Sequence, residues 1–494
     1  MVAAKTAPEL RHNAVGLGPV IFQSLTVVAP AAGVATALPL ATSYAGGATV
    51  LAIIFAIVVT GLMAITISQL ARHLPSSGGL YTYVAHGLGP QAGFIVGWGV
   101  IGAYASTGTY FWGYFGILCR DELSTVWSGT PSWLWAPIAV ISGLLVWFLL
   151  ERGISVSARV GAAMGMFEIA VIVGLALTLI VKAGHHNTAD VFSPHTGNPH
   201  GLSAVFTAMV YTILAFIGFE AAAPLGEEAR NPRRAVPIAV LTSVAVGGVV
   251  YVVAYYAATV FIGPSHMLDF INSNGGNPWG GLGTAGWGAA GILIILVLLN
   301  SLLACANGAG NSGSRMLFSL GRVGGLPSSF ANIDRKRGTP YFAIRVISVS
   351  GIIIAVGLGF IIGGPLNVFA VYATAITILF VVGYMLVAVS CIRYSIREPE
   401  KSGNFLLRYV VPACAFLVFV PVLLASLGIP FLGLAIAPIT GVGRAGIWLA
   451  VAWLALGCIY AAWLTKVQPE AMRRITTVFE KDQPATERQP LQDP

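Results

Sequence analysis

Two acidic residues stand out in this sequence because long apolar runs surround them. Glu168 lies in "GMFEIAVIVG" and Glu220 lies in "AFIGFEAAAPLG". A carboxyl group in hydrocarbon is costly unless it is paired or hydrated, so such residues usually serve a function. Glu168 could carry a proton across a membrane, or it could be a neutral carboxyl group bonded to a neighbouring helix. Glu220 could bind a substrate, gate its pocket or cap a helix; capping or gating is favoured because an acid stabilises a helix N-terminus.

Helix-breaking residues interrupt two of the apolar runs. The first run holds Pro30 and Gly33 in "APAAGV", and the run around Glu220 holds Gly218 and Pro224. Proline lacks an N–H and glycine tolerates unusual dihedral angles, so each run predicts an interrupted helix. A proline kink would explain either interruption alone. The matched pair favours a binding site, because broken helices at corresponding positions of two halves free backbone groups for a substrate.

The composition determines which environment must surround these runs. Of the 494 residues, 56% are hydrophobic and 9% are charged, and the mean hydropathy is +0.83. A soluble domain usually carries about a quarter charged residues. The sequence therefore predicts an all-α polytopic protein in a lipid bilayer. Runs of roughly 20 apolar residues give twelve expected transmembrane helices, at 17–43, 47–71, 92–118, 133–150, 160–182, 202–225, 236–262, 286–313, 341–362, 367–391, 409–428 and 445–465.

The basic residues predict the orientation of these helices. If both termini are cytoplasmic, all but three of the 26 Lys and Arg residues lie on the cytoplasmic side, the exceptions being Arg120, Lys182 and Arg444. Such a bias determines orientation. We expect a multi-pass protein of the cell membrane, with a cytoplasmic N-terminus (1–16) and a cytoplasmic tail (466–494). The positive charge is then a topology signal, and no basic stripe with aromatic residues indicates a nucleic acid partner.

The sequence lacks the motifs of metal sites, disulfide frameworks, common hydrolases and phosphate-binding loops. The five cysteines form no CxxC pair, so neither a zinc site nor a disulfide framework is indicated. The histidines of the loop 183–200 match no metal-site spacing and are better explained as a solvated loop. The chain contains no HExxH, no GxSxG and no intramembrane histidine pair, and "GAGNSGS" lacks the lysine of a phosphate loop. We expect no metal, no cofactor and no enzymatic activity.

Three motifs together carry a family resemblance. They are "FIGFE" (216–220) with "EEARNPRRAVP" (227–237), "LPSSGGLYTYV" (74–84), and "SRMLFSLGRVGGLP" (314–327) with "GTP" (338–340). Over about residues 14–465 the chain resembles a permease of the amino acid–polyamine–organocation (APC) superfamily. The resemblance implies the leucine-transporter type of fold, with helices 1 and 6 broken. Its 5+5 inverted repeat would comprise 17–182 (helices 1–5) and 202–391 (helices 6–10), followed by two C-terminal helices in 409–465.

The resemblance also implies a binding site at the two breaks. The substrate carboxylate would bind the backbone N–H groups of Ala31, Ala32 and Gly33. The substrate ammonium would meet carbonyl groups near Leu214, Ala215 and Ile217. Aromatic residues would surround the rest of the substrate: Phe216 and Phe219 would flank the side-chain pocket, and Tyr104 and Tyr110 could face the same cavity. Glu168 aligns by spacing with a fifth-helix position where some family members carry a lysine linked to proton coupling.

These features predict a secondary-active permease for an amino acid, working by alternating access with proton coupling. The expected partners are a small amino acid or amine, H⁺ and the bilayer. The alternative is a polyamine or amine transporter or exchanger of the same superfamily. The first-helix motif, with its proline, also resembles that of the polyamine-permease branch. Such a substrate would need more acids than Glu168 and Glu220. A non-transporting sensor or an intramembrane enzyme is a weaker alternative, and a sensor would bind its ligand without exchanging it.

Overall fold

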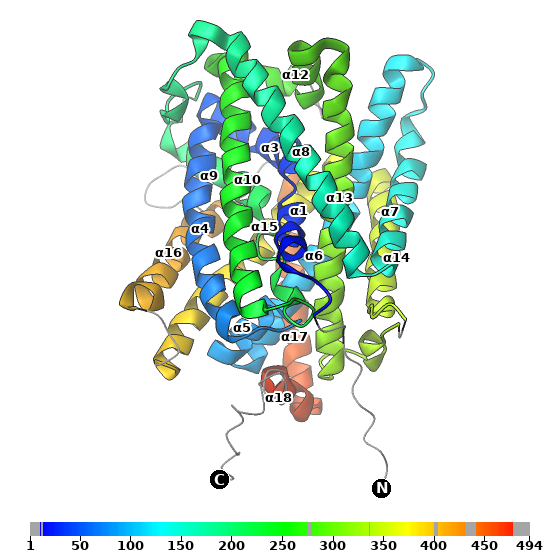
Figure 1. Cartoon of the computed structure of the whole chain (residues 1–494), viewed down its shortest axis with the longest axis vertical. Helices are drawn as coiled ribbons and strands as arrows, with labels where there is room; N and C mark the ends of the chain where they lie inside the picture. Colours follow the sequence, from blue (N-terminus) through cyan, green and yellow to red (C-terminus); the bar gives the residue numbers. More distant parts are fainter. Residues whose placement is uncertain are drawn as a thin grey trace.

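The described part of the chain is helical throughout. The computed structural model describes residues 10, 13–198, 200–273, 278–334, 336–399, 404–429 and 441–477. Within these residues the only β pairing consists of two isolated bridges, Val15 with Ala229 and Asp334 with Thr339. Long helices run side by side through the molecule, with the short α5 and α18 near one end and α12 near the other (Figure 1). The predicted all-α fold is confirmed.

The first apolar run forms three helices, α1 (Leu17–Val28), α2 (Pro30–Ala35) and α3 (Ala37–Ala45). Helix α1 ends because Ala29 adopts a left-handed conformation, with φ +48°. Pro30 then begins α2, where its missing N–H costs nothing because the first N–H groups of a helix have no partner in the helix. The next helices are α4 (Thr49–His73), α5 (Leu80–Leu88), α6 (Pro90–Val126), α7 (Trp135–Glu151) and α8 (Ile154–Ala183).

The run that contains Glu220 is the second interrupted segment. Helix α9 (Leu202–Phe216) ends before Ile217, and the chain then forms turns up to α10 (Pro232–Ile262). Gly218 has φ +110°, and a Cβ atom there would lie 2.3 Å from the Cγ1 atom of Val27. Only glycine fits this position. The later helices are α11 (Met267–Ser273), α12 (Pro278–Trp287), α13 (Ile292–Arg322), α14 (Tyr341–Ile361), α15 (Pro365–Arg397), α16 (Val411–Ser426), α17 (Ala445–Val467) and α18 (Pro469–Thr477).

Ten helical segments of the described chain are long and apolar enough to cross a membrane, which supports a multi-pass membrane protein. Helix α6 and the 15-residue apolar α9 are not among these ten. Helix α13 begins later and extends further than the expected span 286–313. Four short helices lie outside the expected spans or at their margins: α5, α11, α12 and α18. The search for runs of about 20 apolar residues could not find them, because each has ten residues or fewer.

The two interrupted segments lie in the centre of the helix bundle. Every residue of α2 is buried, and so is nearly all of α9. By contrast, only 22% of an 18-residue apolar stretch within Gly441–Val467, which contains α17, is buried. The corresponding stretch within Leu17–Ala35, which contains α1 and α2, is 72% buried. Unpaired peptide groups are tolerated at membrane depth only where protein or a cavity surrounds them. The burial of α2 and α9 therefore makes both breaks possible.

Candidate functional site

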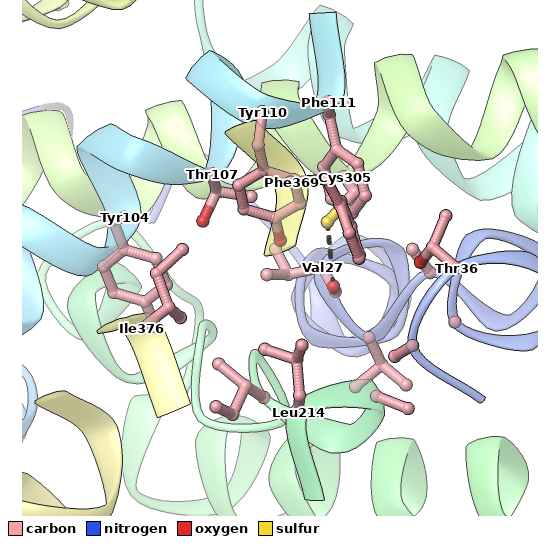
Figure 2. Close-up of a pocket in the computed structure, with 16 residues that line it drawn as sticks. Val27, Thr36, Tyr104, Thr107, Tyr110, Phe111, Leu214, Cys305, Phe369 and Ile376 are labelled. Carbon is pink, nitrogen blue, oxygen red and sulfur yellow. Dashed lines mark hydrogen bonds between the residues drawn. The ribbon is translucent and has the colours of Figure 1, made fainter. Parts of the chain in front are cut away.

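A cavity lies between the two helix breaks. Figure 2 shows its lining, which comes from α1–α3, α6, α9, α13 and α15. The lining residues are Val27, Val28, Ala29, Gly33, Thr36, Ala37, Tyr104, Thr107, Tyr110, Phe111, Leu214, Ala215, Ile217, Cys305, Phe369 and Ile376. About 30 Å³ of this cavity is open to the centre of a water molecule. One water needs roughly 10–15 Å³ by this measure, so an amino acid enters only if the cavity widens.

The structure brings together six of the ten residues expected to bind the substrate. Gly33, Tyr104, Tyr110, Leu214, Ala215 and Ile217 all line the cavity. Ala31 and Ala32 are fully buried beside it and do not line it.

Phe216 and Phe219 differ from the expected position, because neither lines the cavity. The ring of Phe216 packs edge-on against the ring of Tyr251, with 5.1 Å between the ring centres. The ring of Phe219 packs against that of Tyr384, with 5.4 Å between the ring centres. Phe216 is the last residue of α9 and Phe219 lies in the turn that follows, and both side chains are fully buried in the packed interior. They pack the broken segment against Tyr251 and Tyr384 and do not flank the cavity.

The three backbone N–H groups at the first break already have partners within the protein. The Ala31 N–H donates to Oε1 of Glu168 at 2.6 Å, and the Ala32 N–H donates to the hydroxyl of Ser301 at 2.9 Å. The Gly33 N–H donates to the Ala29 carbonyl at 2.8 Å, as in an ordinary helical turn. A substrate carboxylate that docks here would have to take over donors that the protein now uses itself.

Glu168 projects from α8 directly to the first break. Its Oε1 atom accepts both the Ala31 N–H and the Ser301 hydroxyl, the latter at 2.7 Å, and its side chain is 2% exposed. No ion pair with Glu168 occurs among the residues that the structure describes. The carboxyl group thus binds one of the three backbone N–H groups that a substrate carboxylate was expected to bind.

The hydroxyl of Tyr251, on α10, joins the two breaks. Its single O–H proton is shared between the Val28 carbonyl at 2.8 Å and the Ala215 carbonyl at 2.7 Å. The thiol of Cys305 similarly donates to the Val27 carbonyl at 3.0 Å (Figure 2). The sequence argument missed both residues, since a tyrosine and a cysteine in apolar helices are ordinary core residues. The carbonyl groups at the end of α1 and at Ala215 are therefore satisfied by side chains.

Glu220 links the second break to two tyrosines. Its Oε1 accepts the Tyr104 hydroxyl at 2.6 Å, and its Oε2 accepts the Tyr384 hydroxyl at 2.7 Å and the Gly218 N–H at 3.2 Å. An N-cap side chain would bond an N–H two or three residues later in the chain, so Glu220 is not a helix cap in this geometry. Because Tyr104 also lines the cavity, Glu220 contacts the site through one hydroxyl group.

Charged side chains close the bundle at the end where α13 stops. Arg315 and Glu228 form an ion pair in which each side chain is 1% exposed. Arg322 binds Glu227 at 2.6 Å, and Ser77 donates to the same carboxylate from its N–H at 3.1 Å. Burial alone would raise the pKa of Glu227, but Arg322 and Ser77 outweigh it and hold the pKa below its usual value. This carboxylate therefore stays charged and ties the loop after α9 to α13.

Gly33→Val is expected to abolish substrate binding. A Cβ atom at Gly33 would lie 2.3 Å from the Tyr251 hydroxyl, so the bridge between the breaks must shift. Overpacking of this kind costs about 1–3 kcal/mol. Binding is measured on detergent-purified protein that elutes as a single species. Gly18→Val is the matched control, because Gly18 lies in α1 with nothing within 4 Å of its Cβ position. Normal uptake by Gly33→Val would show that this glycine is not part of the site.

Comparison with known proteins places the chain in a family. The amino acid permease family model matches residues 19–467. The branched-chain amino acid permease BcaP of Lactococcus lactis is 23% identical over 396 residues, which cover 76% of this chain and 82% of that protein. The methylthioribose transporter of Bacillus subtilis is 25% identical over 426 residues, covering 82% and 85%. The glutamate/serine transporter AimA of Bacillus subtilis is 25% identical over 329 residues, covering 61% and 58%. The chain therefore belongs to the amino acid permease family of the APC superfamily, whose members are membrane transporters and not enzymes.

Proposed function

We propose that this protein is a secondary-active permease that moves a neutral amino acid across the cell membrane by alternating access, with proton coupling through Glu168. One observation carries the proposal: the carboxyl group of Glu168 bonds directly to the backbone of the first break. A proton-binding group in that place is affected by any movement of α2 relative to α8. Substrate and proton sites would thus share one set of donors.

The hydrogen bonds of Glu168 provide the coupling in this proposal. A carboxyl group binds its proton more weakly while donors bond its charged form. The Ala31 N–H and the Ser301 hydroxyl are such donors, and both belong to helices next to the cavity. A substrate carboxylate that takes over these donors, or a rearrangement that withdraws them, would change whether Glu168 holds a proton. Substrate movement and proton movement would then occur together.

The cavity lining supports a substrate with a neutral side chain. Its polar side chains are hydroxyls and one thiol, from Thr36, Thr107, Tyr104, Tyr110 and Cys305, and none of the described residues that line it is charged. A cationic polyamine would gain little from such walls, because a buried charge needs a partner. The apolar remainder of the lining fits an aliphatic side chain, as the name of the branched-chain relative also suggests. The polyamine alternative is therefore less favoured.

The proposed topology has twelve crossings, counting α6 and α9 with the ten long apolar segments. Residues 17–182 and 202–391 would form the inverted repeats, with a break at the start of each, and 409–465 would add two peripheral helices. The distribution of Lys and Arg would place both termini in the cytoplasm. Of those termini, residues 1–9, 11–12 and 478–494 lie outside the described residues.

A thermal-shift screen followed by transport assays tests the proposal. A ligand that binds the folded state raises its stability by RT ln(1 + [L]/Kd). Neutral aliphatic amino acids are expected to stabilise the purified protein, whereas putrescine and spermidine are not. In proteoliposomes the stabilising amino acid should show counterflow at a single pH and accumulation under an inward pH gradient. Binding without counterflow would indicate a sensor, and stabilisation by polyamines alone would support the amine carrier.

A further inference from the structure

A second hollow lies outside the cavity between the helix breaks, at the end of α7 and the start of α14. These two helices pack against each other (Figure 1). The hollow has a volume of about 490 Å³ and is lined by Glu151, Asp334, Lys336, Arg337, Thr339, Tyr341 and Arg345. It shares no lining residue with the cavity between the breaks. The transport proposal gives this hollow no role.

The hollow is built by three elements that hold one another in place. The turn 334–339 closes on itself, because the Asp334 N–H donates to the Thr339 carbonyl at 2.9 Å. The carboxylate of Asp334 accepts the backbone N–H groups of Lys336 and Arg337 at 2.8 Å and 3.1 Å. Arg337 then reaches the carbonyl of Glu151, the last residue of α7, at 3.3 Å. The side chains of Lys336 and Arg337 therefore project from a backbone that these bonds hold in place.

The charges of the lining favour an anion. Asp334 is committed to its turn, where the N–H groups of Arg337 and Lys336 lower its pKa and keep it charged. Glu151 is shared between Arg345 at 3.2 Å and the Trp147 indole N–H at 2.9 Å. Three basic side chains, Lys336, Arg337 and Arg345, line the hollow with these two acids, so its positive charges exceed its negative charges by one. Arg152 stands next to Glu151 and stacks on Phe148, 4.4 Å from the ring centre.

Apolar stripes lead away from the hollow along both helices. On α7, Phe148 and Leu144 lie three and seven residues before Glu151 and therefore on the same face; their exposed fractions are 53% and 48%. On α14, Val349 and Ile353 lie four and eight residues after Arg345 and are 41% and 64% exposed. A membrane-facing surface of this kind suits acyl chains, whereas a free anion would make no use of it.

We infer that this hollow binds the phosphate-bearing headgroup of an anionic phospholipid, with Lys336, Arg337 and Arg345 as the phosphate ligands and the stripes of α7 and α14 along the acyl chains. The proposed orientation places the hollow on the cytoplasmic side, where the leaflet carries the anionic lipids. Basic pockets between transmembrane helices on that side suit such headgroups. The site is separate from the transport cavity, so its test does not depend on the proposed function.

The test uses the full chain purified in detergent, titrated separately with dioleoylphosphatidylglycerol, dioleoylphosphatidylcholine and inorganic phosphate. Stabilisation against heat, followed to saturation, gives the apparent affinity for each. Phosphatidylglycerol is expected to bind saturably and more tightly than phosphatidylcholine, and inorganic phosphate is expected to have no effect. The variant Lys336→Gln/Arg337→Gln should weaken phosphatidylglycerol binding about 25-fold, since each basic residue contributes roughly 5-fold near an anionic surface.

A matched control separates this site from general charge effects. Arg473→Gln/Arg474→Gln removes the same charge from α18, where the Arg473 side chain is 78% exposed, and should keep the affinity of the unaltered chain. Should the double variant at the hollow fold poorly, the single change Lys336→Glu should still weaken binding more than 5-fold. Unchanged affinity in the hollow variants, or an equal loss in the α18 control, would overturn the inference. Saturable stabilisation by inorganic phosphate would assign the site to a soluble anion and overturn the lipid assignment.

Discussion

Glu168→Gln is expected to abolish proton-driven accumulation of substrate and to leave substrate exchange intact. Glutamine has the same shape as glutamate, and its Oε1 can still accept the Ala31 N–H and the Ser301 hydroxyl. The first break therefore keeps its geometry while the side chain loses the ability to bind and release a proton. Exchange of substrate across the membrane requires no net proton cycle, so only the gradient-driven process should fail.

The measurement is uptake into proteoliposomes with and without an inward pH gradient, compared with counterflow at a single pH. Glu220→Gln is the informative control, because it alters the other buried carboxyl group of the site. Tyr104 and Tyr384 hold Glu220 in place, so this change should slow accumulation and counterflow together. If Glu168→Gln protein still accumulates substrate in response to the gradient, Glu168 is structural and another group couples transport to protons.

The helix breaks could be predicted because their causes are local. Pro30 has no N–H wherever it lies, and Gly218 stands in an apolar run where few other residues allow a φ of +110°. Glu168 could be singled out for a related reason, since a lone carboxyl group in an apolar helix has few harmless explanations. These inferences needed only residue type and sequence distance.

The partners of the breaks could not be predicted, because they come from distant parts of the chain. Tyr251 bonds to Val28 across 223 residues, and Cys305 bonds to Val27 across 278. Neither residue differs in its sequence context from an ordinary core residue. The direction of Phe219 depends on the path of the turn after α9, where Ile217 leaves the helical conformation with ψ 130°. A change in one backbone angle there redirects every later side chain, and residue type does not encode it.

Removing one partner of the buried ion pair between Arg315 and Glu228 is expected to destabilise the protein by about 3–5 kcal/mol. Both side chains are 1% exposed, so Glu228→Leu leaves a guanidinium group in the interior without its carboxylate. The backbone carbonyl of Asn311 still accepts from Arg315 at 3.0 Å, but a neutral carbonyl group does not neutralise the charge. Thermal unfolding of the purified protein measures the loss. The exposed pair Arg473–Glu470 is the control, and Glu470→Leu should cost at most about 1 kcal/mol.

The double variant Arg315→Met/Glu228→Leu then separates stability from the transport cycle. Replacing both members of a buried ion pair with apolar residues is often neutral or stabilising, so most of the lost stability should return.

The pair joins α13 to the loop after α9, and the Glu228 carbonyl also accepts the Val15 N–H at 3.1 Å. In the proposed topology these contacts close the cytoplasmic side, and they must separate each time that side opens. A charged pair can be rehydrated when it separates, whereas two apolar side chains favour the closed state. The double variant should therefore unfold at nearly the original temperature and yet transport more slowly than the unaltered chain. Transport at the original rate would show that this end of the bundle does not open during the cycle.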